Sequence, residues 1–167
     1  MKKIIVAAVI GILITAVILC LSAFFRSEPR TVLALCYAET DKVIQLYDIS
    51  EGDEFSVEFI HSVNKSPVKD IFVIREGKIF VDRTVYSAFG AGVQTEVEEG
   101  QTLSYDKEGN MVVSGFNIEF PRVKYIVSPV YDHVLEIDGE KLSLTEKCGS
   151  GARVYFELRQ TRTGLFR

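Results

Sequence analysis

The sequence has little histidine, little cysteine and, beyond its first 25 residues, a shortage of positive charge. Its 167 residues include two histidines and three cysteines. No Cys-x-x-Cys or paired Cys/His spacing occurs, which argues against a structural zinc site. Residues 26–167 hold 17 basic and 23 acidic residues, a formal net charge of −6. A nucleic-acid-binding protein needs a basic face to neutralise phosphates, so the sequence argues against a nucleic-acid partner.

Catalytic signatures are absent as well. There is no Gly-x-Ser-x-Gly nucleophile elbow, and Gly149-Ser150-Gly151 is typical of a turn before a last strand. Paired carboxylates for glycoside hydrolysis cannot be singled out among 23 acidic residues. We therefore expect no enzyme activity and no cofactor. A hydrolase or metal enzyme that uses His61 and His133 is the least favoured alternative.

The chain opens with an uncharged apolar run from Ile4 to Phe25. A helix over this run, at about 1.5 Å rise per residue, spans the ~30 Å hydrocarbon core of a bilayer. The run exceeds the apolar part of a cleavable signal, roughly 7–15 residues, and Leu21-Ser22-Ala23 is a poor cleavage site. With Lys2 and Lys3 favouring a cytoplasmic N-terminus, we predict that residues 1–25 form a retained transmembrane anchor and that the remainder is extracytoplasmic. A cleaved signal and a secreted domain are the alternative.

The rest of the sequence has the periodicity of strands. Phe55, Val57 and Phe59 alternate with polar residues, as do Val154 and Phe156, which is typical of strands with one buried face. Turn sequences separate the runs at 51–53, 76–77, 108–110 and 138–139. We predict an all-β antiparallel sandwich or barrel-like domain of about nine or ten short strands over 31–160, after a linker at 26–30 and before a tail at 161–167.

The cysteines leave two alternatives open. Cys20 lies in the expected anchor, whereas Cys36 and Cys148 lie near the two ends of the β-domain. A disulfide between them would close a long loop and stabilise the fold by about 2–4 kcal/mol. Two separate buried thiols are the other alternative, since Cys36 follows the apolar run 32–35.

Three segments interrupt the strand pattern, and they supply the candidate binding or interaction residues. In the first, His61 lies two residues after Phe59 and so faces the same, inward side of the strand. It is therefore either a site residue or a core histidine. In the second, Gly90 and Gly92 allow positive φ, so their amides form either an anion-binding nest or a tight connection. In the third, Pro129 interrupts a strand before the second histidine. The candidate residues are His61, Ser62, Asn64, Lys65, Phe89, Gly90, Gly92, Glu96, Asp132 and His133.

Taken together, the three segments resemble a known family. His61-Ser62-Val63 with Pro67-Val68, then the run 87–92, then Asp132-His133, are similar in order and spacing to the bacterial and archaeal family known as domain of unknown function 1850. The resemblance spans roughly residues 31–160. It implies a small exported or membrane-anchored protein without an established activity, often encoded beside tripartite solute transporters of the TAXI type. It assigns no role to any residue.

The sequence and the resemblance together predict a membrane-anchored extracytoplasmic accessory protein of such a transporter. It would act by binding the solute-binding protein or the membrane unit of the transporter. The loops at 61–67 and 89–96 would form the one surface that makes this contact. The alternative is a small organic-anion-binding module in which His61, Lys65 and the amides of Gly90 and Gly92 hold the ligand.

Overall fold

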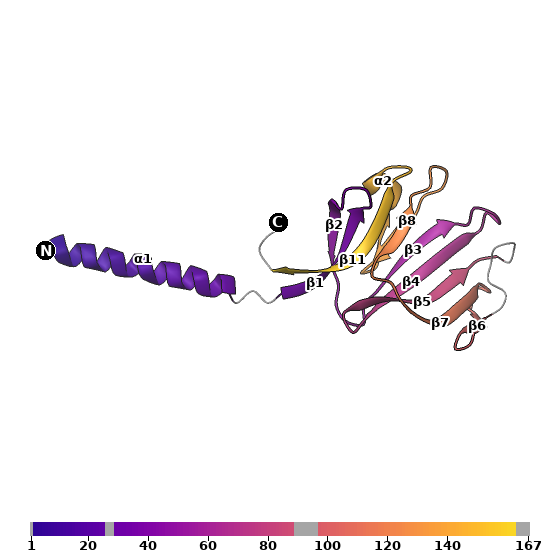
Figure 1. The fold of residues 1–167 in the computed structure, drawn as a ribbon, viewed down its shortest axis with the longest axis horizontal. Helices are drawn as coiled ribbons and strands as arrows, with labels where there is room; N and C mark the ends of the chain where they lie inside the picture. The colour runs from indigo at the N-terminus through magenta and orange to yellow at the C-terminus, as the bar shows by residue number, and fades with distance from the viewer. Residues whose placement is uncertain (1, 26–28, 89–96, 163–167) are drawn as a thin grey trace. The chain divides into compact units, whose positions relative to one another are not determined.

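The computed structural model describes residues 2–25, 29–88 and 97–162. The chain divides into two compact units, one that joins residues 1–30 to 160–167 and one that is Thr31–Arg159. The first contains helix α1, Lys2–Phe25 (Figure 1). Its described side chains, at 10–21, are exposed and mostly apolar. Among the described residues, no helix has both the length and the apolarity needed to span a membrane. The helix is thus confirmed, and its role as an anchor stays a prediction.

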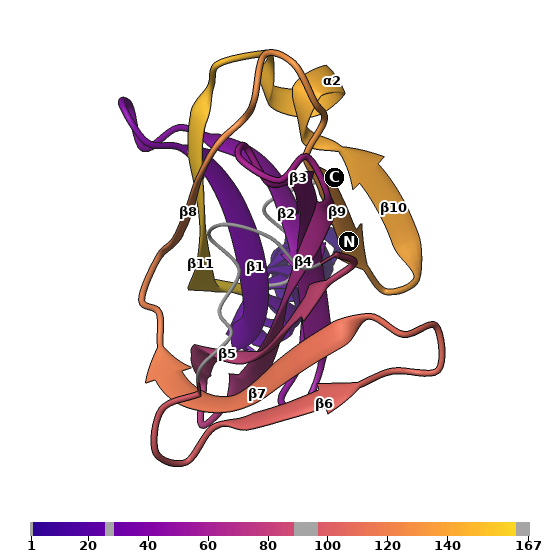
Figure 2. The same ribbon diagram turned by 90° about the vertical axis from the view of Figure 1, so that its right-hand side faces the viewer.

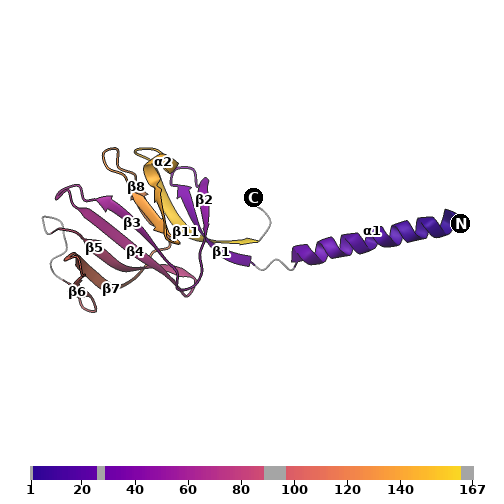
Figure 3. The ribbon, with the colours of Figure 1, turned by 180° about the vertical axis from the view of Figure 1, so that it is seen from behind.

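The second unit is built from two antiparallel sheets, seen as separate layers in Figures 1 and 3. The smaller sheet has the order β2 (Val43–Asp48), β1 (Pro29–Tyr37), β11 (Arg153–Arg162), β8 (Val123–Ile126). The larger sheet has the order β10 (Glu140–Ser143), β9 (Val134–Ile137), β3 (Glu54–Ile60), β4 (Pro67–Arg75), β5 (Lys78–Tyr86), β7 (Met111–Glu119), β6 (Thr102–Tyr105). Figure 2 shows β6 and β7 at one side of the larger sheet and β9 and β10 at the other.

The all-β prediction is confirmed, with two corrections. The architecture is the sandwich and not a barrel, because each sheet ends in two edge strands. Eleven strands are present in the described residues where nine or ten were expected. Four of these, β6, β8, β9 and β10, have only four residues each, which is too short for a clear alternation pattern. A short helix, α2 (Leu144–Cys148), was also not anticipated.

The hydrophobic core lies between the sheets, and the alternation in the sequence decides which side chains enter it. Val154 and Phe156 of β11 are fully buried in the core cluster, whereas Tyr155 between them packs on the outer face with Ala34. From the larger sheet, Phe55 and its neighbours fill the other side. The core side chains include Leu33, Leu35, Phe55, Phe72, Ile74, Leu135, Leu144 and Phe156.

Three of the expected hairpins are confirmed, and one expected hairpin is wrong. The turn at 108–110 lies in the connection between the antiparallel strands β6 and β7. Glu76-Gly77 joins β4 to β5 with φ values of 53° and 67°, and Asp138-Gly139 joins β9 to β10 with 50° and 74°. Positive φ at both positions is the signature of the type I′ turn, which matches the twist of paired strands. The turn at 51–53 instead crosses from β2 in the smaller sheet to β3 in the larger one.

The structure corrects the disulfide expectation. Cys36 and Cys148 are both free and buried. Cys36 packs against Ala34 and Tyr155 on the outer face of the smaller sheet, whereas Cys148 belongs to the core between the sheets. Because neighbouring residues of a strand point to opposite faces, Leu35 takes the inward position and Cys36 points away from Cys148. The alternative of two separate thiols therefore holds.

Gly115 is the glycine with the tightest steric requirement among those described. It lies in an irregular part of β7 with φ of +81°, and a Cβ there would approach the carbonyl oxygen of Gly100 to 2.5 Å. We expect Gly115→Ala to lower the free energy of unfolding by about 2 kcal/mol, because strain at positive φ adds to this contact. Gly109→Ala is the matched control, since Gly109 has φ of +85° and an added methyl group there would meet nothing within 4 Å. In denaturant unfolding of the full chain in detergent, the control should lose only about 1 kcal/mol of unfolding free energy. Equal losses of unfolding free energy in the two variants would contradict the steric contact at Gly115.

Candidate functional site

The first predicted segment forms a tight turn between β3 and β4. The His61 amide donates to the Ser66 carbonyl oxygen at 2.9 Å, and the Lys65 amide donates to the His61 carbonyl oxygen at 3.0 Å. The His61 ring also takes part in the turn, because its Nδ1 accepts a hydrogen bond of 3.3 Å from the Val63 amide. Ser62 is exposed at the tip of the turn. His61 therefore supports the local backbone.

Asn64 is held by the same turn but keeps one donor unused. Its Oδ1 accepts hydrogen bonds from the Ser66 amide at 3.3 Å and from Ser66 Oγ at 2.8 Å. Its Nδ2 is buried and has no hydrogen-bond partner among the described residues. Lys65, the next residue, is exposed and adopts a positive φ of 56°.

His133, in the third segment, is a core histidine. Its side chain is only 7% exposed, its ring stacks on Phe59 with centroids 5.5 Å apart, and it meets the edge of Tyr125 at 5.9 Å. Its Nδ1 accepts a hydrogen bond of 3.4 Å from the Ser128 amide. Burial lowers the pKa of His133, and the neighbouring Asp132 offsets this effect only in part.

Asp132 has a structural partner of its own. Its Oδ1 accepts a hydrogen bond of 3.1 Å from the Thr145 amide in the first turn of α2. Burial acts to raise the pKa of Asp132, but hydrogen bonds from Thr145 and Ser143 outweigh it and hold the pKa below its ordinary value. Asp132 thus anchors the loop to α2.

Two of the three predicted segments come together at one end of the sandwich. Lys65 Nζ lies 5.9 Å from the centre of the Tyr131 ring, a cation–π contact between the two loops. Beside this contact, Val63 is 61% exposed, Val130 73% and Tyr131 41%. We call Val63, Lys65, Val130 and Tyr131 the loop-end surface. It is apolar at its tips, which is unusual for short solvent-exposed loops.

The second predicted segment lies outside the described residues, and with it Phe89, Gly90, Gly92 and Glu96. Whether its amides face the loop-end surface therefore stays a prediction. In the part of the chain that is described, no three His, Cys, Asp or Glu side chains are close enough together to hold a metal ion.

A carboxylate that was not among the residues predicted from the sequence joins the two sheets. Asp70 of β4 lies opposite Val57 of β3 and Thr84 of β5. Thr84 Oγ1 donates to Asp70 Oδ1 at 2.9 Å, and Tyr125 Oη donates from the smaller sheet to Asp70 Oδ2 at 2.9 Å. Burial raises the pKa of Asp70 above its ordinary value, against the effect of these two hydrogen bonds. The alternation of Val68, Asp70 and Phe72 already places this acid on an inward position, and that signal could have found it.

Asp70 lies in the wall of a cleft between the sheets, which we call the inter-sheet cleft. Its volume is about 520 Å³, and it lies where β8, an edge strand of the smaller sheet, faces β4, β5 and β7 of the larger one. The exposed side chains of Ile118 and Phe120 border it. Its polar and charged lining residues are Asp70, Thr84, Tyr86, Arg122, Lys124 and Tyr125. Size and composition are those of a small-molecule site.

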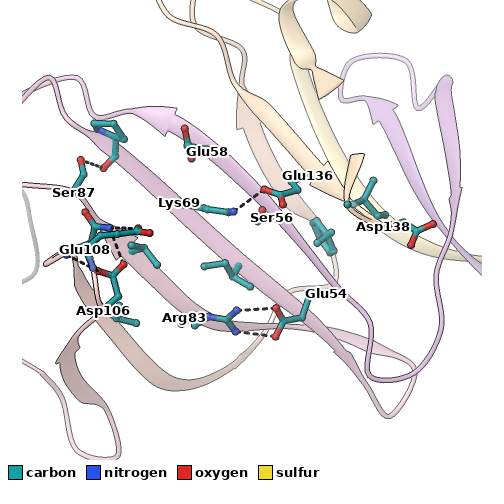
Figure 4. A pocket seen from close by; sticks show the side chains of 18 residues that line it. Glu54, Ser56, Glu58, Lys69, Arg83, Ser87, Asp106, Glu108, Glu136 and Asp138 are labelled. Atoms are coloured by element: carbon teal, nitrogen blue, oxygen red, sulfur yellow. Dashed lines mark hydrogen bonds and ion pairs between the residues drawn. The ribbon is translucent and has the colours of Figure 1, made fainter. Parts of the chain in front are cut away.

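A second hollow, of about 610 Å³, lies on the opposite face of the larger sheet (Figure 4). Each cation that lines it is paired with an acid there: Lys69 with Glu136 at 2.8 Å and Arg83 with Glu54 at 2.9 Å. The hydrogen bond from Arg83 holds the pKa of Glu54 below its ordinary value. Four further acids line the hollow without a cation between them: Glu58, Asp106, Glu108 and Asp138. This surplus of negative charge disfavours an anionic ligand in this hollow.

Fold and site together define a small acidic β-sandwich protein with an apolar loop end and a half-buried carboxylate between the sheets. A family model described as Domain of unknown function (DUF1850) matches residues 55–144, which is more than half of the chain. The chain therefore belongs to this family, as its motifs indicated. Comparisons with curated proteins and with solved structures found no match.

Proposed function

We propose that this chain is a membrane-anchored extracytoplasmic accessory protein that contacts a component of a TAXI-type tripartite solute transporter through its loop-end surface. The observation that carries the proposal is the exposure of Val63, Val130 and Tyr131 in two motif loops that touch each other. Exposed apolar side chains that gather in one place are typical of protein contact sites. The apolar α1 and the family resemblance support the membrane location.

The chemistry of the histidines also favours contact over catalysis. His61 and His133 each accept a hydrogen bond from a nearby backbone amide through Nδ1, so these nitrogens hold loops in place. The loops they support carry the exposed apolar tips. A rigid loop end presents such tips at a lower entropic cost of binding than a flexible one.

The test is capture of transporter components by the tagged full chain from detergent-solubilised native membranes. We expect the wild-type chain to recover the solute-binding protein or the membrane unit. Val63→Glu or Val130→Glu should reduce recovery about tenfold or more, because each puts a charge into an apolar contact. Ile126→Glu is the matched control, since Ile126 is 60% exposed on β8 and outside the loop-end surface. Failure to recover any transporter component, or equal losses for all three variants, would contradict the proposal.

The organic-anion module is the second candidate, and one observation favours it. Lys65 forms no ion pair within the described residues, and Asn64 Nδ2 beside it lacks an acceptor. Two adjacent unused donors suit a carboxylate ligand. Calorimetric heat on titrating dicarboxylates into the full chain, lost in Lys65→Met, would favour this candidate over protein contact.

A further inference from the structure

We propose that the inter-sheet cleft binds a small organic amine, with the ligand's ammonium group on Asp70 and its apolar body against Phe116, Ile118 and Phe120. This site is separate from the loop-end surface and does not depend on the transporter proposal. It rests on a cavity, on a carboxylate without a cation, and on apolar walls that reach the solvent.

The charge of Asp70 has no compensating cation in the structure. No Lys or Arg of the described residues forms an ion pair with it, whereas Glu136, Glu119 and Glu54 of the same sheet pair with Lys69, Lys78 and Arg83. Thr84 and Tyr125 supply one O–H donor to each oxygen. A carboxylate has about four lone-pair sites, so each oxygen can still accept from a ligand. Desolvating a carboxylate without a cation is unfavourable, and a bound ammonium would compensate for it.

The cations near the mouth of the cleft do not supply this charge. Arg122 and Lys124 both line the cleft. Arg122 pairs with Glu157 at 2.9 Å and with Asp41 at 3.3 Å, and its guanidinium lies 4.3 Å from the Tyr155 ring. That places its charge on the outer face of the smaller sheet. Lys124 alternates with the inward Tyr125 and so also points outward. Neither cation forms an ion pair with Asp70 among the described residues, so the carboxylate keeps its charge available for a cationic ligand.

The walls of the cleft define the rest of the ligand. Phe116 is partly buried, whereas Ile118 is 46% and Phe120 37% exposed. An aromatic or branched apolar group of the ligand would cover them, while Tyr86 lines the polar side. The chemistry fits an aryl-alkyl or branched alkyl amine better than a sugar or a dicarboxylate.

Methyl NMR of the full chain in detergent, labelled at the isoleucine δ1 methyl groups, tests the proposal. The probes are 2-phenylethylammonium, the neutral 2-phenylethanol and the anionic phenylacetate, each with a blank titration into empty micelles. We expect the ammonium to shift the Ile118 methyl signal saturably, with a dissociation constant of about 1 mM or tighter for a probe this small. The Ile126 methyl, outside the cleft, should not move. The alcohol and the acid should bind at least about tenfold more weakly.

Two variants separate the ligand site from the fold. Asp70→Asn keeps the shape and can still hydrogen-bond Thr84 and Tyr125, and it should weaken the ammonium at least about tenfold. Phe120→Ala keeps the carboxylate, trims an exposed wall, and should weaken the ammonium about threefold to tenfold. No saturable shift at Ile118, equal binding of the alcohol or the acid, or unchanged binding in both variants would each overturn the proposal.

Discussion

Replacing Phe55 by alanine is expected to lower the free energy of unfolding by about 3–5 kcal/mol. Phe55 is 1% exposed, and it stacks on Phe72 at 5.0 Å and packs against Phe156 at 5.6 Å. It therefore contacts aromatic rings from both sheets. Its removal leaves a cavity at the centre of the sandwich that rigid strands cannot close.

The measurement is denaturant unfolding of the full chain in detergent, followed by circular dichroism. Ile126→Ala serves as the control, because it shortens a side chain that is 60% exposed and should change stability by no more than about 0.5 kcal/mol. The melting temperature of the Phe55 variant should fall by about 10 °C or more. A loss below about 1 kcal/mol would contradict the position of Phe55 between the two sheets.

Removing the Tyr125 hydroxyl should have the second largest effect on stability. Tyr125→Phe keeps the ring contacts with Phe59 and His133 but deprives Asp70 Oδ2 of its donor. Hydrogen bonds to charged groups contribute about 1.5–3 kcal/mol, so we expect a loss of about 2–3 kcal/mol at pH 7. The loss should shrink in acid, where a protonated Asp70 no longer has a buried charge to stabilise.

The sign of the pH dependence follows from the raised pKa of Asp70. The folded state binds this proton more tightly than the unfolded state, whose Asp pKa is about 3.9. The contribution of Asp70 to stability is therefore greatest below the unfolded pKa and declines as the pH rises through the folded pKa. Tyr125→Phe removes a hydrogen bond that lowers this pKa, so the decline should become larger and extend to higher pH.

Asp70→Asn is the matched variant for this experiment. It has no proton to lose, so its stability should lack the decline, and at pH 7 it should be at least as stable as the wild type. His133 contributes with the opposite sign, because burial lowers its pKa and its protonation below about pH 6.5 opposes folding. The difference between the Asp70→Asn and wild-type profiles isolates Asp70. If the stabilities of the wild type and of Asp70→Asn change with pH in the same way across the acid range, the ionised Asp70 does not destabilise the folded state. That result would contradict the raised pKa of Asp70.

Part of the arrangement of the candidate residues can be read from the structure, and their role stays a prediction. The sequence pointed to the loops around His61 and His133, and the structure brings these loops together through Lys65 and Tyr131. It could not say that His133 would stack on Phe59, because that contact joins the end of one strand to a loop 74 residues further along. The second segment, 89–96, lies outside the described residues, and its place in the site stays a prediction.

The local features of this protein follow from its sequence alone. Alternation sets the buried faces of β3 and β11, and the positive-φ pairs Glu76-Gly77 and Asp138-Gly139 set two hairpins, because both signals act between residues close along the chain. Three features emerge only when the sheets pack: which distant strands pair, that the turn at 51–53 crosses between sheets, and that Tyr125 meets Asp70 from 55 residues away. Such pairings depend on how twisted sheets pack, and no short stretch of sequence encodes that.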